Sequence, residues 1–331
     1  MIKLPESRFN SFDSHFASFI CKIAKTQSTG LFLAAALVSE ALRNGHVCID
    51  IDQIESYNSQ FSPSEQLQLP PSKAWKVSLE QTSVVGKPGD YRPLILDSGK
   101  LYLYRYWNYE QQLGTLLLER IVNKPVLPRK PDELTFNKLF QKETEVNWQK
   151  VAAAVSLFNT FTSISGGPGT GKTTTVAKIL TLLQSFSEKT LRIALCAPTG
   201  KAAARLSKSL SSANSLDGTI PVRLPDETYT IHRLLVPIPD TPEFQFNRKN
   251  KLPYDIVLVD EASMVDLALM TKLVMAVPQS CRLIFLGDKD QLSSVEAGAV
   301  LGDICDTGNE HFFSVDQSNK INAIIPEYSH P

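Results

Sequence analysis

The chain has 331 residues, of which 43% are hydrophobic and 21% are charged, and its 34 Lys and Arg residues balance its 34 Asp and Glu residues. This composition is typical of a globular protein of about two domains, and the zero net charge argues against a non-specific nucleic-acid binder, although it allows a local basic groove. The five cysteines include no C-x-x-C pair, so neither a zinc site nor a disulfide framework is expected. The early apolar run 31–38 is too short to span a bilayer and no signal peptide follows Met1, so we expect a cytoplasmic protein that does not enter the membrane.

The first third of the chain predicts a mostly helical domain. Residues 30–43 form an apolar helical pattern, and residues 101–107 form an aromatic run with the alternation of a strand, followed by a helical pattern to residue 121. The aromatic run has two further interpretations, a platform on which bases stack and a docking surface for a partner protein. Alternating aromatic residues are most typical of a half-buried strand, which favours the structural interpretation.

Three prolines between residues 124 and 131 predict an extended linker, and we place a domain boundary there. The predicted domains are residues 1–130 and residues 131–331. After the linker, short apolar runs at 162–165, 192–197, 255–260 and 282–287 predict strands, and helices follow the first three. Strands without polar alternation are typical of a parallel sheet covered by helices on both faces, so the predicted fold class is α/β with a parallel sheet flanked by helices. Segments 214–227 and 237–253 read as irregular insertions.

The P-loop pattern G-x-x-x-x-G-K-[ST] spans residues 166–173, between the first of these strands and a helix. Such a turn presents backbone N–H groups and a helix N-terminus to phosphate, so the predicted fold class becomes an α/β P-loop NTPase, of the RecA-like kind. Lys172 is expected to reach the β- and γ-phosphates, and Thr173 to ligate Mg²⁺. The predicted nucleotide-binding residues are Gly166, Gly167, Pro168, Gly169, Thr170, Gly171, Lys172, Thr173 and Thr174.

Two carboxylates end the third apolar strand, in the arrangement called Walker B. Asp260 at the strand tip is predicted to hold Mg²⁺, directly or through water, and Glu261 to polarise the attacking water. Past the next strand, Gln291 is predicted to sense the γ-phosphate, whereas Asp288 and Asp290 are typical turn formers.

Other polar residues lie at helix starts. Thr199 and Lys201 follow the second strand and could grip a phosphate of single-stranded DNA, although an ordinary helix cap explains them equally well. Gln149 opens the helix before the P-loop strand and could read the adenine edge, against the alternative of a solvent-facing helix start. His232 is more typical of a structural histidine than of a catalytic one.

Five motifs carry a resemblance to a known family. In chain order between residues 147 and 306 they read SGGPGTGKTTT, APTGKAAARL, TIHRLL, VDEASMVD and FLGDKDQLSSVEAGAVLGDI. Together they resemble superfamily 1 DNA helicases, and specifically the RecD family, the alpha subunits of exodeoxyribonuclease V (the RecBCD enzyme). The segment before the linker, including LYLYRYWNYE, is similar in layout to the N-terminal domain of that family.

This resemblance implies an ATP-dependent 5′–3′ DNA helicase that acts in double-strand break repair by homologous recombination. It implies ATP and Mg²⁺ as cofactors, RecB and RecC as partner subunits, and single-stranded DNA and double-stranded DNA ends as substrates. It implies the site roles given above, with Gln291 coupling the γ-phosphate to the grip on DNA. The nuclease site of such a complex belongs to RecB, and the N-terminal domain docks on RecC.

The sequence departs from the resemblance in one respect. Superfamily 1 motors have two RecA-like lobes, and motifs of the first lobe alone occur here, so the chain reads as truncated. We therefore expect the chain by itself to bind ATP·Mg²⁺ and to hydrolyse it slowly. The alternatives are a non-enzymatic assembly module and another P-loop class such as a kinase or a GTPase. Segment 287–290 lacks the Asn of the N-K-x-D motif that a GTPase uses.

Overall fold

The computed structural model describes residues 3–140, 146–167, 169–214, 225, 227–291, 297–306, 313–326 and 328. The chain divides into two compact units. The first comprises Met1–Gln112 with the short segments Asp266–Ala268 and Ser293–Ala299, and the second comprises the rest. The division falls within helix α5 (Tyr104–Val122), earlier in the chain than the proline-rich segment that suggested a boundary at residue 130. Within the described residues, no helix combines the length and the apolar character that crossing a membrane requires.

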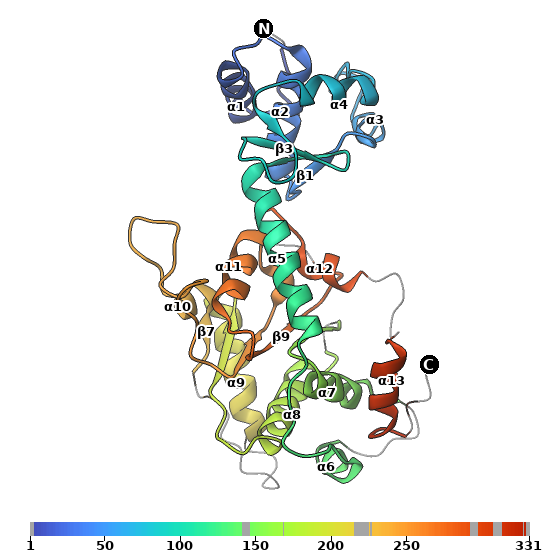
Figure 1. Cartoon of the computed structure of the whole chain (residues 1–331), viewed down its shortest axis with the longest axis vertical. Helices are drawn as coiled ribbons and strands as arrows, with labels where there is room; N and C mark the ends of the chain where they lie inside the picture. The colour runs from blue at the N-terminus through green and yellow to red at the C-terminus, as the bar shows by residue number, and fades with distance from the viewer. Residues whose placement is uncertain are drawn as a thin grey trace. The chain divides into compact units, whose positions relative to one another are not determined.

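The first unit packs helices around a small sheet (Figure 1). Residues Leu31 to Ala41 of helix α2 are buried without interruption, which explains the apolar run in the sequence and confirms the predicted helix. The sheet has the strand order β1-β4-β3-β2, with β2 parallel to β3 and the other pairs antiparallel. The elements of this unit are α1 (Ser11–Ile23), α2 (Thr29–Arg43), β1 (Cys48–Asp50), α3 (Ile54–Ser59), α4 (Ser72–Glu80), β2 (Val85–Gly86), β3 (Leu94–Asp97) and β4 (Lys100–Leu103).

The aromatic run forms a strand over less than its predicted length. Strand β4 ends at Leu103 and helix α5 begins at Tyr104, so the predicted strand 101–107 is wrong in its second half. Tyr102 and Trp107 are buried with Ile95 in one cluster, and the Trp107 indole N–H donates to Asp97 Oδ2 at 3.0 Å. The rings of Tyr102 and Trp107 therefore belong to the core of the unit, as the structural interpretation predicted.

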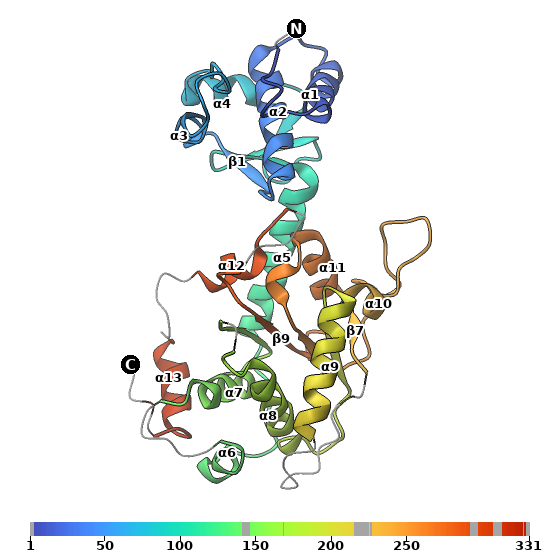
Figure 2. The ribbon, with the colours of Figure 1, turned by 180° about the vertical axis from the view of Figure 1, so that it is seen from behind.

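The second unit contains a five-stranded parallel sheet with the order β5-β9-β8-β6-β7. The four predicted strands are confirmed to within one residue at each end, and the two-residue strand β7 was not predicted. Figure 2 shows α8 and α9 side by side along the sheet, and both belong to one apolar core with the strands. The strands are β5 (Phe161–Ser165), β6 (Ile193–Ala197), β7 (Tyr229–Thr230), β8 (Ile256–Val259) and β9 (Arg282–Gly287). The helices are α6 (Glu133–Leu139), α7 (Trp148–Phe158), α8 (Lys172–Ser185), α9 (Gly200–Asn214), α10 (Ile231–Leu235), η1 (Ala262–Met264), α11 (Leu267–Ala276), α12 (Val300–Cys305) and α13 (Val315–Asn322).

Burial explains why these strands were readable from the sequence. All four residues of β8 are buried, and so are five of the six in β9, because both strands lie inside the sheet with β5 and β6 as neighbours. A strand covered on both faces has no polar side to interrupt its apolar run. The insertion at 237–253 is a loop with one bridge between Pro237 and Phe244, and most of the insertion at 214–227 lies outside the described residues.

One buried arginine anchors the end of α5 within the second unit. The guanidinium of Arg120 is 1% exposed and donates to the carbonyl oxygens of Val277 at 2.7 Å, Pro278 at 3.0 Å and Cys281 at 3.1 Å. The hydroxyl of Thr160, at the start of β5, donates to the Arg120 carbonyl at 2.6 Å. Burial lowers the pKa of Arg120 from its ordinary value.

Replacing Arg120 with Ala is therefore expected to destabilise the protein. The change leaves three carbonyl groups without a charged donor, and we expect the free energy of unfolding to fall by about 3 kcal/mol or more. Urea denaturation followed by circular dichroism measures this loss. The control is Arg105→Ala, which removes an exposed arginine from the same helix and should change stability by about 0.5 kcal/mol or less. Equal midpoints for the two variants would contradict the anchoring role.

Candidate active site

Three strand ends meet at one edge of the parallel sheet. Because β9 lies between β5 and β8, the turn that follows β9 lies between the P-loop, which follows β5, and the carboxylate pair that follows β8. Hydrogen bonds join these ends: Gly166 N–H donates to the Gly287 carbonyl at 3.1 Å, and Lys289 N–H donates to Ser165 Oγ at 3.0 Å. The carboxyl edge of a parallel α/β sheet is the usual place for a ligand.

The P-loop has the backbone that its glycines predict. Gly169 has φ +79° and Gly171 has φ +76°, in the left-handed region that favours glycine, and Gly171 is the N-cap of α8. A Cβ added at Gly169 would meet nothing within 4 Å, whereas one at Gly171 would lie 2.8 Å from Gln149 Nε2. The loop is therefore open where a phosphate would lie and tight where α8 begins.

Lys172 is the first residue of α8 and folds back over the loop. Its ammonium group donates to the carbonyl oxygens of Gly166 and, at 3.0 Å, Gly167. The Thr170 hydroxyl donates to the Gly167 carbonyl at 2.9 Å, and Thr174 is exposed in the first turn of α8. Of the predicted nucleotide-binding residues, Pro168 and the side chain of Thr173 lie outside the part that the structure describes.

Gln149 lies against the P-loop, as its predicted role requires. It belongs to the first turn of α7, and its amide Nε2 donates to the Thr170 carbonyl at 3.1 Å. The Gln149 side chain therefore contacts the P-loop and does not point only into solvent. Contact with adenine stays a prediction.

The carboxylate pair follows β8 with a distinctive backbone. Asp260 N–H donates to the Cys196 carbonyl at 2.8 Å, which continues the pairing of β8 with β6, and Glu261 N–H donates to Asp260 Oδ1 at 2.9 Å. Glu261 has φ +51°, uncommon for a residue with a side chain, and such conformations concentrate at functional sites. Burial raises the pKa of Asp260, while the charges of Lys172 and Arg205 act in the opposite direction.

Replacing Asp260 with Asn is expected to stabilise the fold while weakening Mg²⁺-dependent nucleotide binding. Because the folded-state pKa is raised above the unfolded value, ionisation of this carboxylate costs stability, and the cost grows as pH rises above the unfolded-state pKa. Asn removes the charge and keeps an oxygen for the Glu261 N–H. We expect the melting temperature at pH 7 to rise by about 2–4 °C, with a smaller gain near pH 4. Scanning calorimetry beside exposed Asp240→Asn checks this, and an unchanged or lower melting temperature at pH 7 would contradict it.

The turn after β9 is built by Asp288. Its buried side chain accepts from the Asp290 N–H at 3.1 Å, and its carbonyl accepts from the Gln291 N–H at 3.2 Å. Asp288 is thus a turn former, as one interpretation held. Gln291 is exposed on this central turn, and its proposed contact with the γ-phosphate stays a prediction.

The predicted DNA-binding residues begin α9 beside the carboxylate pair. Thr199 Oγ1 accepts from the Ala202 N–H at 3.2 Å, so the capping interpretation is correct, and Thr199 and Lys201 are both exposed. The role of these two residues in DNA binding stays a prediction. The His232 ring packs 5.7 Å from the Phe244 ring, centroid to centroid, which favours the structural interpretation of that histidine.

One residue at this site received no role from the sequence. Arg205 of α9 lies with its Nη1 3.7 Å from Glu261 Oε1. The sequence signal that could have identified Arg205 is its position four residues after Lys201, on the same helix face.

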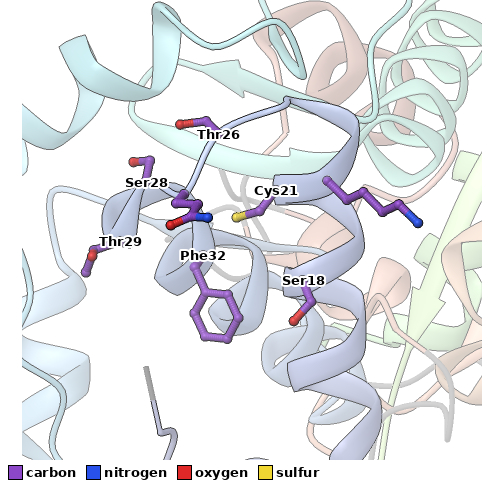
Figure 3. Close-up of a pocket in the computed structure, with 8 residues that line it drawn as sticks. Ser18, Cys21, Thr26, Ser28, Thr29 and Phe32 are labelled. Atoms are coloured by element: carbon purple, nitrogen blue, oxygen red, sulfur yellow. The ribbon is translucent and has the colours of Figure 1, made fainter. Parts of the chain in front are cut away.

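A cavity of about 410 Å³ lies elsewhere, between α1 and the start of α2 (Figure 3). Figure 3 shows Cys21 and Ser18 on one helix facing Phe32 on the other. Burial raises the pKa of the Cys21 thiol, so it stays protonated at neutral pH. Lys22 is the one charged residue among those that line the cavity. The cavity therefore lacks the combination of a lysine with carboxylates that the sheet edge has.

The sheet edge fits a magnesium nucleotide. Mg²⁺ is usually held by one or two carboxylates together with phosphate oxygens, and the half-buried Asp260 is a carboxylate at this edge. The glycine backbone of the P-loop and the ammonium group of Lys172, at the same edge, are groups of the kind that bind phosphate.

Two family models match the chain. Residues 6–102 match the model described as the RecBCD enzyme subunit RecD, N-terminal domain, and residues 149–297 match the model described as an AAA domain. The first match lies in the first compact unit, and the second begins at Gln149 and includes the P-loop and the carboxylate pair.

Curated relatives match most of the chain. The RecBCD enzyme subunit RecD of Mycolicibacterium smegmatis is 41% identical over 88% of this chain and 52% of the relative, and that of Haemophilus influenzae is 34% identical over 82% and 46%. The ATP-dependent RecD2 DNA helicase of Deinococcus radiodurans is 34% identical over 61% of this chain and 26% of the relative. The chain spans about half the length of the RecD subunits that it matches.

Proposed function

The chain belongs to the RecD family, and from this premise we propose that it is the ATP-dependent 5′–3′ DNA helicase and translocase subunit of a RecBCD-type exodeoxyribonuclease V. The observation that carries the proposal is that the P-loop with Lys172 and the pair Asp260 and Glu261 lie at the same edge of one parallel sheet.

Each group at the sheet edge then has a defined task. The P-loop amides and the N-terminus of α8 bind the phosphates, and Lys172 exchanges its carbonyl contacts for phosphate oxygens. Asp260 and Thr173 would hold Mg²⁺, which would supply positive charge against that of the phosphates. Glu261 orients the attacking water and accepts its proton. Gln291 senses the γ-phosphate from the turn beside the P-loop, and Gln149 contacts adenine.

The rest of the proposal concerns DNA and partners. Thr199 and Lys201 contact a phosphate of the translocating single strand at the start of α9. The subunit works with RecB and RecC at double-stranded DNA ends in the cytoplasm, in double-strand break repair by recombination, and its first unit docks on RecC. The nuclease activity belongs to RecB.

A reconstituted complex with RecB and RecC tests this function. The RecB motor is inactivated by substitution of its own P-loop lysine, so that ATP hydrolysis and strand movement report on the present chain. We expect hydrolysis stimulated by single-stranded DNA and unwinding that starts from 5′ overhangs. Assembly without ATP-driven movement would favour a docking module instead, and a preference for GTP would favour another P-loop class.

A further inference from the structure

Helix α9 presents a row of basic residues to solvent. Lys201, Arg205 and Lys208 are exposed at positions i, i+4 and i+7, which share one helix face, while Leu206 and Leu210 are buried on the opposite side. The guanidinium of Arg205 forms an ion pair with Glu261, Nη1 to Oε1 at 3.7 Å. The row therefore connects the start of α9 with the carboxylate that activates water.

Strand order explains how this contact arises. Strands β6 and β8 are parallel neighbours, with Cys196 opposite Val259, so α9, which follows β6, begins beside the pair that follows β8. Arg205 lies four residues after Lys201 and thus about one turn farther along α9.

Exposure makes this ion pair reversible. The Arg205 side chain is 76% exposed, whereas that of Glu261 is 23% exposed. An ion pair in such a setting is weak, and a phosphate competes well for arginine because it accepts two parallel N–H bonds. Because most of the Arg205 side chain is exposed, a ligand can reach the guanidinium while Nη1 lies 3.7 Å from Glu261.

We propose that Arg205 is a positioning residue that restrains Glu261 until a phosphate of single-stranded DNA binds the guanidinium. While it is paired with Arg205, the Glu261 carboxylate is held away from orienting a water molecule. A DNA phosphate that has been gripped at the start of α9 draws Arg205 along the helix and releases the carboxylate. This inference rests on the proposed function, and it supplies the link by which DNA binding stimulates hydrolysis. By linkage, occupation of the nucleotide site also changes the affinity for DNA.

The test compares Arg205→Gln, Arg205→Lys and a matched control, Arg192→Gln, in the complex with an inactive RecB motor. Arg192 is also an exposed arginine paired with a carboxylate, that of Asp255, but it lies at the opposite end of β6. ATP hydrolysis is measured without DNA and with saturating oligo(dT). For Arg205→Gln we expect the DNA-free rate to rise about twofold to fivefold and the DNA-saturated rate to stay close to that of the parent. Arg205→Lys keeps the charge and should restore much of the stimulation ratio, and Arg192→Gln should equal the parent.

Two results would overturn the inference. One is a DNA-free rate for Arg205→Gln that equals or falls below that of the parent, since a released Glu261 must work faster. The other is the same rise in Arg192→Gln, which would reduce the effect to a general loss of positive charge. Failure of the proposed function looks different, because the parent complex itself would then show no hydrolysis or no stimulation by DNA.

Discussion

Replacing Lys172 with Gln is expected to lower ATP hydrolysis by this subunit at least about 100-fold and to stop its strand movement. The Lys172 ammonium lies over the P-loop, bonded to the carbonyl oxygens of Gly166 and Gly167, so its charge is in place to meet the phosphates. Gln keeps the length of the side chain but supplies no charge against the developing negative charge of the transition state. The measurement is steady-state ATP hydrolysis with single-stranded DNA in the complex with an inactive RecB motor.

The matched control lies on the same helix. Lys178→Gln removes an equivalent charge from α8, where the ammonium stacks on the Phe140 ring at 4.9 Å and not on the P-loop. Hydrolysis by this control should stay within about twofold of the parent, as for most substitutions outside a site. A Lys172→Gln variant that kept full hydrolysis and 5′–3′ movement would end the motor assignment for this chain.

Replacing Glu261 with Gln is expected to separate nucleotide binding from hydrolysis. The amide cannot accept the proton of the attacking water, so the hydrolysis rate should fall about 10²–10⁴-fold. The P-loop and Asp260 are untouched, and Gln has nearly the same shape, so the affinity for a fluorescent ATP analogue should stay within about threefold of the parent. Single-turnover hydrolysis and equilibrium binding measure the two effects.

The control for this change is Glu188→Gln, which neutralises an exposed glutamate after α8 and should leave both quantities as in the parent. If Glu261→Gln weakened binding as much as it slowed hydrolysis, Glu261 would act on the bound nucleotide or its metal and not on water.

The sequence predicted those parts of the second unit that depend on local patterns. Strands β6, β8 and β9 were readable because long buried stretches leave unbroken apolar runs, and the P-loop was readable because Gly169 and Gly171 must adopt positive φ. Such features are local to the chain. For the same reason the polar residues that follow each strand were found as candidates.

Long-range pairing limited the prediction elsewhere. Strand β1 of three residues exists because it pairs with a distant strand, as Cys48 does with Tyr102, and β2 is too short, at two residues, to leave a pattern in the sequence. The contact of Arg205 with Glu261 depends on β6 lying beside β8, an order that no local pattern encodes. The aromatic run misled for a related reason, since alternation continues past Leu103 into residues that the chain uses as the first turn of α5.

The hydroxyl of Thr199 can cap helix α9 and donate a hydrogen bond to DNA at the same time. A hydroxyl carries one proton and two lone pairs, and the bond from the Ala202 N–H occupies a lone pair, which leaves the proton to point toward a nucleic-acid oxygen. Capping the helix and binding a DNA strand are therefore compatible roles for this one hydroxyl group. A serine at this position would retain both, whereas a valine of almost the same shape would lose them together.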